Sequence, residues 1–229
     1  MEKDFWLQRW QNEETGFHQE SLNPYLAHFY GDKGPALEKR KNQKVFVPLC
    51  GKSMDMLWLA QNGYEVLGIE CSEIAVKDFF EMHDLDYQII EEKVFKRYIA
   101  EASSEGRCRI EILLGDFFDL SVNDLAGVTD IFDRASMIAL PGEMRFEYSE
   151  TMSRLQASGL RTLLITLTYP HGEMDGPPFS VTDEELNDYY GEDFKIDKLM
   201  AKNIIAEEPS FQSRGVSELM ETAYKLTRN

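Results

Sequence analysis

Short apolar runs alternate along the chain, from about Lys44 onward, with stretches in which apolar residues recur at helical spacing. Apolar runs of about four to eight residues are typical of buried strands, whereas recurrence at every third or fourth position is typical of amphipathic helices. The pattern predicts strands at residues 45–50, 65–70, 94–100, 107–114, 130–133, 161–168 and 218–227. It predicts helices at residues 54–61, 72–82 and 142–158.

The order of these elements predicts the fold class. Strands that alternate with helices form a mostly parallel sheet with helices on both faces, so we expect an α/β fold. Residues 94–100 and 107–114 interrupt the alternation, because the segment Ser103-Ser104-Glu105-Gly106 between them is typical of a hairpin turn. In such sheets a ligand binds beyond the carboxyl ends of the strands. The functional residues are therefore expected directly after the strands.

Turn and capping residues mark the ends of two predicted helices, and nothing in the chain marks a domain boundary. Ser72 is a candidate N-cap, and Gly63 is a candidate C-terminal cap of the helix before it. The sequence contains no internal repeat, low-complexity tract or Pro/Gly/Ser-rich linker. We therefore expect one domain over residues 1–229, with an N-terminal helical lid at 1–43 and an α/β core at 44–229.

The amino-acid composition argues against some classes of binding partner. Hydrophobic residues make up 43% and aromatic residues 12% of the 229 residues, which is enough apolar material for a large core. Lys and Arg total 24 and Asp and Glu total 41, so the formal net charge is −17. A surface this acidic repels nucleic-acid phosphates and anionic lipid heads. We expect a small-molecule ligand, with no nucleic-acid or membrane partner, and a monomer.

The cysteine count and the N-terminus indicate a cytoplasmic protein. The three cysteines, Cys50, Cys71 and Cys108, are widely spaced and lack the spacing of a zinc site or a redox pair. Reduced thiols are expected. The N-terminal segment is charged and unlike a secretory signal, and no apolar run is long enough to span a membrane.

The first candidate site segment is Pro48-Leu49-Cys50-Gly51-Lys52-Ser53, after the first predicted strand. A phosphate-binding loop also requires a glycine five positions before Gly51, where the chain has Phe46. The dinucleotide fingerprint with its several glycines is missing as well, which argues against a nicotinamide oxidoreductase. Two interpretations remain for Gly51: a turn that lets the backbone approach a ligand, or an ordinary strand–helix turn.

Glu70 ends the second predicted strand, 19 residues after Gly51. An acidic residue about 20 residues after the glycine turn is placed to accept hydrogen bonds from both ribose hydroxyls of an adenosine ligand. The alternative is a solvated carboxylate at a strand end. Since the glycine turn precedes it, we favour the nucleoside role.

Two further strand ends carry polar and aromatic residues. Asp116 and Phe117 follow the strand that ends at Leu114. Asp116 is placed to accept a hydrogen bond from an adenine amine, and Phe117 is placed to pack on the adenine ring. An aromatic residue there is also common in an ordinary core. Arg134 follows the strand at 130–133, and a guanidinium is costly to desolvate unless it meets an anion. Its expected partner is Asp133, a substrate group or the cofactor carboxylate.

The N-terminal segment and the loop after residue 168 supply the remaining candidates. Trp6 and Trp10 are one helical turn apart, so they form either a packing face or an aromatic lid over a flat ligand. His18 is a candidate base. A loop rich in Pro and Gly runs from Tyr169 to Phe179 and is expected to border the substrate. His171 and Asp175 in this loop have no third ligand at suitable spacing, so we expect no metal site.

These segments resemble the thiopurine S-methyltransferase family, particularly its bacterial members. The resemblance begins near Trp6, keeps the same order to the end of the chain, and weakens after Ile204. Its most specific part is the first strand–helix–strand region. The segments that carry it are WLQRWQ, GFHQE, VFVPLCGKSMDMLWLAQNGYEVLGIECSE, GDFFDL, FDRASMIALP and GPPF.

The resemblance implies a class I methyltransferase fold, with a seven-stranded, mostly parallel sheet and an antiparallel final strand. It implies methyl transfer from S-adenosyl-L-methionine, which becomes S-adenosyl-L-homocysteine, to an aromatic or heterocyclic thiol such as a thiopurine, a reaction of xenobiotic detoxification. Phe17 corresponds to a substrate-facing aromatic residue. The family's basic residue beyond the substrate has no counterpart in Pro209-Ser210-Phe211. The implied cofactor contacts are Trp10, Leu49, Glu70 and Arg134, with Gly51, Asp116 and Phe117 beside them.

The chemistry also allows other acceptors. A heteroaromatic thiol is often ionised near neutrality, so positioning of sulfur against the methyl carbon by residues such as Phe17 and Arg134 is the main requirement and no catalytic base is needed. Selenium or tellurium compounds are alternative acceptors. Oxygen or nitrogen acceptors would need a base, for which His18 and His171 are candidates. A non-catalytic adenosine-binding module is a further alternative.

Overall fold

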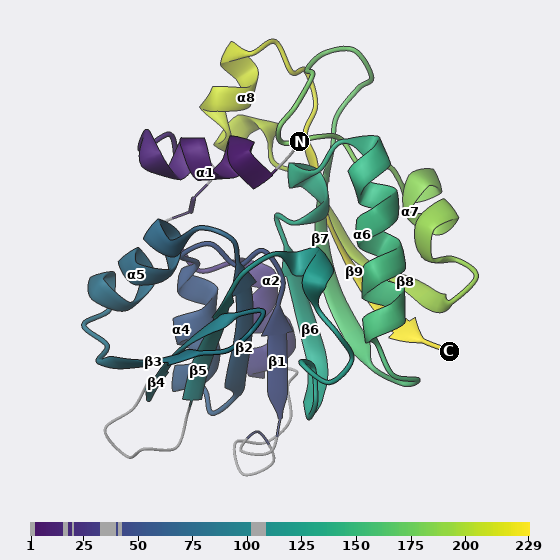
Figure 1. The fold of residues 1–229 in the computed structure, drawn as a ribbon. Helices are drawn as coiled ribbons and strands as arrows, with labels where there is room; N and C mark the ends of the chain where they lie inside the picture. Colours follow the sequence, from purple (N-terminus) through teal and green to yellow (C-terminus); the bar gives the residue numbers. More distant parts are fainter. Residues whose placement is uncertain (1–2, 16–17, 20, 33–39, 41–42, 102–108) are drawn as a thin grey trace. The chain divides into compact units, whose positions relative to one another are not determined.

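The computed structural model describes residues 3–15, 18–19, 21–32, 40, 43–101 and 109–229. The chain forms two compact units, Glu2–Phe132 and Asp133–Asn229. The boundary falls inside the strand β6 (Val128–Arg134). Each unit has its own strands and helices (Figure 1).

The first unit contains a sheet with the strand order β3-β4-β5-β2-β1-β6. The central strands β1 (Lys44–Val47), β2 (Glu65–Glu70) and β5 (Arg109–Leu114) are almost entirely buried, and β1 pairs in parallel with both β2 and β6. Strand β5 runs parallel to β2, with Glu70 opposite Leu114. The carboxyl ends of β1, β2 and β5 therefore lie at the same edge of the sheet.

Two strands extend this sheet in the antiparallel sense. Strand β4 (Lys96–Glu101) pairs with β5, as the hairpin prediction required, and β3 (Tyr87–Glu91) pairs with β4. Strand β3 occupies the outer position of the sheet order, and four of its five residues are exposed. Because it lacks a buried apolar run, the sequence pattern did not predict it.

Polar caps fix the helices that follow β1 and β2. The helix α4 (Met54–Gln61) begins after Ser53, whose side chain accepts a hydrogen bond from the Asp55 N–H. The helix α5 (Glu73–Met82) begins after Ser72, whose hydroxyl accepts one from the Ala75 N–H at 3.3 Å. Gly63, with φ of +91°, follows the C-cap of α4. The cap predictions at Ser72 and Gly63 are therefore confirmed.

The described N-terminal residues include three helical elements. The helix α1 (Lys3–Gln11) is followed by a helical turn, α2 (Pro24–Leu26), and a π-helical turn, η1 (Ala27–Asp32). The Tyr30 hydroxyl donates to the Ile131 carbonyl at 3.2 Å, which ties this segment to β6. All of these elements belong to the first unit.

The second unit contains the strands β7 (Arg161–Thr168), β9 (Met220–Arg228) and β8 (Phe194–Asn203), in that order. Strand β9 is antiparallel to both of its neighbours, which confirms the expected antiparallel final strand. The unit also holds the helices α6 (Gly142–Leu155), α7 (Asp183–Tyr190) and α8 (Pro209–Ser213). Among the described residues, no helix is both long and apolar enough to cross a membrane.

The predicted fold class is confirmed, whereas two details of the prediction are corrected. The described residues form nine strands rather than seven, because β3 and β8 are added to those that the pattern predicted. The first strand ends at Val47 rather than Cys50. The chain turns there because Pro48 has no N–H for a strand ladder and Leu49 adopts a φ of +44°.

Candidate functional site

The turn after β1 brings the backbone of Gly51 against an aromatic side chain. Leu49 and Gly51 both have positive φ values, +44° and +51°. A Cβ on Gly51 would lie 3.4 Å from the ring of Trp10, in van der Waals contact with the indole, and the positive φ would strain any other residue at this position. Trp10 is only 4% exposed although it lies in a terminal helix. The structure therefore brings together Trp10 and the Gly51 turn, which are 41 positions apart in the sequence.

The Glu70 carboxylate holds this turn from the neighbouring strand. Its Oε2 accepts a hydrogen bond from the Gly51 N–H at 2.9 Å, and its Oε1 accepts bonds from the N–H groups of Cys71 and Ser72, both at 2.8 Å. Burial raises the pKa of Glu70, although the hydrogen bonds from Ser72, Gly51 and Cys71 act in the opposite direction. The carboxylate is thus fixed in orientation.

Sequence analysis predicted an acidic residue close to the glycine turn, but not its three backbone partners. The Cys71 thiol donates a fourth hydrogen bond to this carboxylate, so donors of the chain itself occupy about all four of its lone-pair directions. What Glu70 can offer a ligand hydroxyl is therefore its charge and the position that the thiol takes. The residue is therefore not a solvated carboxylate, because it is 6% exposed.

The third strand end lies beside the second. The Gly115 N–H donates to the Glu70 carbonyl at 2.9 Å, so the segment after β5 starts next to Glu70. Asp116 caps the short 3-10 helix η2 (Phe117–Asp119), because its Oδ1 accepts from the Phe118 N–H at 3.0 Å. Phe117 is buried and makes an edge-on contact with Phe118. In the structure Asp116 therefore caps a helical turn and Phe117 packs in the core. Both residues lie at the predicted edge of the sheet.

A pocket of about 570 Å³ is lined in part by Cys71 and Gly115, which adjoin Glu70 and Asp116 in the sequence. Its walls come from α1, from the start of α5, from the β3–β4 turn and from the end of β5. Its lining residues include Leu7, Gln11, Cys71, Phe95, Leu114 and Gly115. The sequence did not indicate this pocket, because its walls come from four separate elements.

Cys71 is the titratable thiol of this wall. Burial raises its pKa, and the nearby negative charge of Glu70 raises it further. Cys50, in the turn after β1, is buried and its pKa is raised by the same two causes. Both thiols are therefore neutral at physiological pH and weak nucleophiles.

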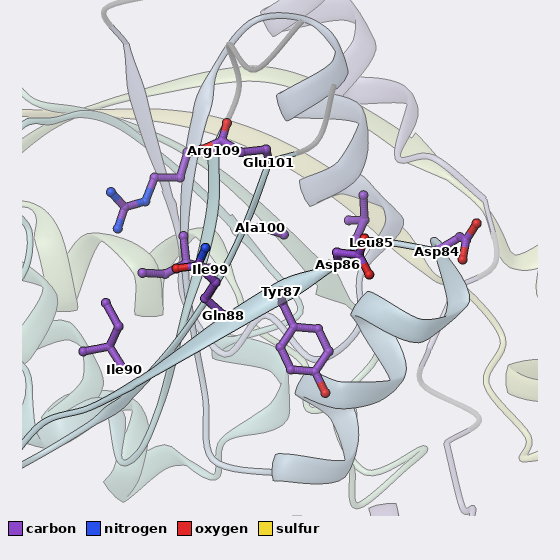
Figure 2. A pocket seen from close by; sticks show the side chains of 10 residues that line it. All are labelled: Asp84, Leu85, Asp86, Tyr87, Gln88, Ile90, Ile99, Ala100, Glu101 and Arg109. Carbon is purple, nitrogen blue, oxygen red and sulfur yellow. The ribbon is translucent and has the colours of Figure 1, made fainter. Parts of the chain in front are cut away.

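A larger pocket, of about 770 Å³, lies elsewhere in the first unit (Figure 2). It is formed by the α5–β3 connection and by side chains of β3, β4 and β5, among them Tyr87, Ile99 and Arg109. None of the residues expected to bind the cofactor lines either pocket. The smaller pocket is lined by Cys71 and Gly115, the chain neighbours of Glu70 and Asp116, whereas the larger pocket has no such neighbour.

Arg134 is the last residue of β6 and belongs to the second unit. It is half-buried and is followed by Ala135 in the left-handed region, with φ of +65°. Next to it, Asp133 is buried, and its Oδ2 accepts a hydrogen bond from the Tyr148 hydroxyl at 2.8 Å. Burial raises the pKa of Asp133 to about 6, although hydrogen bonds from Tyr148 and Ser136 lower it.

The loop from Tyr169 to Phe179 is held by a set of hydrogen bonds within the second unit. The Tyr169 hydroxyl donates to the Pro178 carbonyl at 2.9 Å, and the buried Arg145 donates to the Ser180 carbonyl at 2.8 Å. Arg214, just after α8, donates to the Pro177 carbonyl at 3.4 Å. Sequence analysis found no basic residue at Pro209-Ser210-Phe211, but Arg214 follows Ser210 by one helical turn.

The remaining candidates are Phe17, His18 and His171. Phe17 lies outside the described residues. His18 is half-buried, and His171 is exposed. Within the part of the chain that the structure describes, no group of three or more His, Cys, Asp or Glu side chains has the arrangement of a metal site.

Two solved structures with a similar fold are named as methyltransferases. A SAM-dependent methyltransferase from Anabaena variabilis matches with a TM-score of 0.61 and 14% identity, over 99% of this chain and 95% of the other. Magnesium protoporphyrin IX methyltransferase from Synechocystis, solved with bound SAM, matches with a TM-score of 0.59 and 12% identity, over the same shares, 99% and 95%. At these identities the likeness concerns the fold alone.

Relatives of known name match over the whole chain. The thiopurine S-methyltransferase of Pseudomonas fluorescens is 42% identical over 228 residues, which cover 100% of this chain and 98% of the relative. That of Nitrosospira multiformis is 41% identical over 226 residues, covering 99% and 98%. The family described as Thiopurine S-methyltransferase (TPMT) matches residues 1–229. This chain, with its class I methyltransferase fold, therefore belongs to the thiopurine S-methyltransferase family.

Proposed function

We propose that the protein transfers the methyl group of S-adenosyl-L-methionine to the sulfur of an aromatic or heterocyclic thiol, such as a thiopurine, and releases S-adenosyl-L-homocysteine. The observation that carries this proposal is the cluster of Trp10, Gly51 and Glu70 at the edge where β1 and β2 end. This edge is where ligands bind in parallel α/β sheets.

The described residues of the first unit fit an adenosine-containing cofactor. Glu70 is oriented by its backbone partners, and its negative charge suits a ribose hydroxyl as a donor in place of the Cys71 thiol. The pocket of about 570 Å³ is within the usual range for small-molecule sites, about 300–1,000 Å³. Its walls at Leu7, Phe95 and Leu114 are apolar, which suits a flat base.

The other proposed contacts follow from these positions. Leu49 and Gly51 let the backbone approach the ligand, and Asp116 and Phe117 border the purine. Arg134 supplies a cation for the cofactor carboxylate. Trp10 covers the Gly51 turn.

The cofactor supplies a methyl group that is already activated on a positively charged sulfur. The protein's own contribution is to orient the two reactants and to exclude competing nucleophiles. Cys71 stands in the pocket wall, where an ionised thiol would itself be methylated. Because burial and Glu70 raise its pKa, Cys71 stays neutral and does not compete with the acceptor.

The acceptor is proposed to be a thiol that reaches the site as thiolate. A thiol with a pKa near 7 is about a thousandfold more ionised at pH 7 than a phenol with a pKa near 10. We propose that Phe17 faces the acceptor. Pro209-Ser210-Phe211 lacks a basic residue, whereas Arg214, one helical turn after Ser210, lies at the Tyr169–Phe179 loop of the second unit. The protein is proposed to act as a cytoplasmic monomer.

Calorimetry and a methyl-transfer assay test this function together. S-Adenosylhomocysteine should bind and NAD should not. With radiolabelled S-adenosylmethionine, an aromatic thiol should be methylated and the matching phenol left almost untouched between pH 6 and 9. Binding without transfer to any thiol, selenol, catechol or amine would indicate a non-catalytic module. Equal turnover of thiol and phenol at neutral pH would indicate a catalytic base, with His18 tested first.

A further inference from the structure

Lys52, in the Gly51-Lys52-Ser53 segment, has no role in the proposed reaction. Its Nζ lies 2.9 Å from Oδ2 of Asp78 in α5, and its side chain is only 16% exposed. The same Nζ lies 5.6 Å from the ring centroid of Trp10 in α1, within cation–π distance. A phosphate-binding lysine points its charge at a ligand, whereas this charge is directed at two residues of its own chain.

These contacts join three elements of the first unit. Asp78 belongs to α5, Lys52 to the turn after β1, and Trp10 to α1. The indole of Trp10 therefore meets the Gly51 backbone and the Lys52 cation, and Lys52 is itself anchored on Asp78.

The placement of α1 depends on such contacts. It has nine residues, and an isolated helix of that length is marginal in water. Its residues Lys3, Leu7 and Gln11 recur at helical spacing and line the pocket beside Glu70. Whatever holds Trp10 in place therefore also holds one wall of the pocket.

We propose that Lys52 is a positioning residue, which links Asp78 to Trp10 and keeps α1 seated on the Gly51 turn. This inference rests on the proposed function, in which Trp10 and this pocket receive the cofactor. It assigns to Lys52 no contact with the reacting atoms.

The test uses the full chain with charge-removing and charge-keeping variants. Lys52→Met and Asp78→Asn remove either end of the ion pair, and Lys52→Arg keeps the cation. Lys77→Met is the matched control, because Lys77 forms an ion pair on the same helix, with Glu73 at 3.3 Å, and carries the same charge. Trp10 emission is read without ligand, in a background with Trp6→Phe and Trp58→Phe. S-Adenosylhomocysteine affinity and kcat at saturating cofactor are measured in the otherwise unchanged chain.

We expect Lys52→Met to shift the ligand-free Trp10 emission to longer wavelength and to weaken S-adenosylhomocysteine binding about five- to tenfold, with little change in kcat. Asp78→Asn should act in the same direction, Lys52→Arg should restore both readouts, and Lys77→Met should leave them unchanged. The proposal is overturned if Trp10 emission is unchanged in Lys52→Met. It is also overturned if Asp78→Asn binds the ligand as well as the parent, since Lys52 would then act on the ligand directly. If the parent chain fails to bind S-adenosylhomocysteine, the proposed function fails, while the ligand-free emission still tests the link.

Discussion

The Glu70 carboxylate accepts hydrogen bonds from three backbone N–H groups, so its removal affects both a ligand and the turn that it holds. We expect Glu70→Ala to weaken S-adenosylhomocysteine binding by about 1.5–3 kcal/mol, the usual range for a hydrogen bond to a charged group. Glu70→Gln keeps one acceptor oxygen and should disturb the fold less, which urea unfolding will show. An alanine variant that binds like the parent would leave Glu70 with the structural role only.

The neutral state of Cys71 leads to a second prediction at the residue scale. Because burial and the Glu70 charge raise its pKa, Cys71 should react with iodoacetamide at pH 8 more than about a hundredfold more slowly than free cysteine. Glu70→Gln removes the nearby charge and should accelerate the reaction. Mass spectrometry of the labelled peptide measures both rates. Labelling of Cys71 as fast as free cysteine would contradict its assignment as a neutral wall residue.

Asp133 should make stability depend on pH in a defined direction. Its pKa is about 6 in the folded chain and about 4 when unfolded, so the folded state binds the proton more tightly. This group's contribution to stability is therefore lost as pH rises from about 4 to about 6, by about 3 kcal/mol in total. Relative to the parent, Asp133→Asn should gain stability across this window in urea unfolding. Tyr148→Phe, which removes the donor to Asp133, should move the window to higher pH. A constant difference between Asp133→Asn and the parent would contradict the assignment.

At the scale of elements, helices and strands were predicted best where apolar residues recur at buried positions. The helix at 54–61 and the strands at 65–70 and 161–168 have the predicted bounds, since each combines a buried apolar pattern with a defined end. Strands β3 and β8 were not predicted, because most of their residues are exposed and apolar residues do not recur in them at clear strand or helix spacing. The predicted helix at 142–158 ends at Leu155.

The two helix caps provide a matched test of burial. Ser72 caps α5 through the N–H of the buried Ala75, and Thr182, which is itself exposed, caps α7 through the N–H of the half-buried Glu185. Removal of a cap costs about 1 kcal/mol on average, and a buried donor without a partner costs more than one that water can reach. We expect Ser72→Ala to cost about 1–2 kcal/mol and Thr182→Ala about 0.5–1 kcal/mol in urea unfolding. Equal losses would show that burial of the donor does not matter here.

At the scale of the whole molecule, the sequence predicted the fold class and the edge of the sheet where candidate residues gather. Trp10, Gly51 and Glu70 do lie together there, because parallel strands end at one edge. The pocket beside them was not predictable, since side chains from α1 and the β3–β4 turn meet only in the folded chain. Phe17 lies outside the described residues, so its role stays a prediction. The expectation of one domain also stays a prediction, because the chain forms two compact units.

The net charge of −17 predicts a response of the whole protein to salt. Repulsion between like charges destabilises a compact chain, and salt screens it over about 10 Å at 0.1 M. We expect Tm to rise by a few degrees between about 20 mM and about 300 mM NaCl. Sodium sulfate at matched ionic strength serves as a control for salt-specific effects. A fall in Tm over this range would mean that screened ion pairs outweigh the repulsion.

The bonds of Glu70 bear on how enzymes of this kind can diversify. In the proposed function a substitution there would be selected against twice, once through the ligand and once through the Gly51, Cys71 and Ser72 backbone that loses its acceptor. The Tyr169–Phe179 loop lies in the other unit and shares none of these bonds. With this loop proposed to border the acceptor, a lineage would change the acceptor through it in single steps, while the donor half of the reaction would be inherited with the fold.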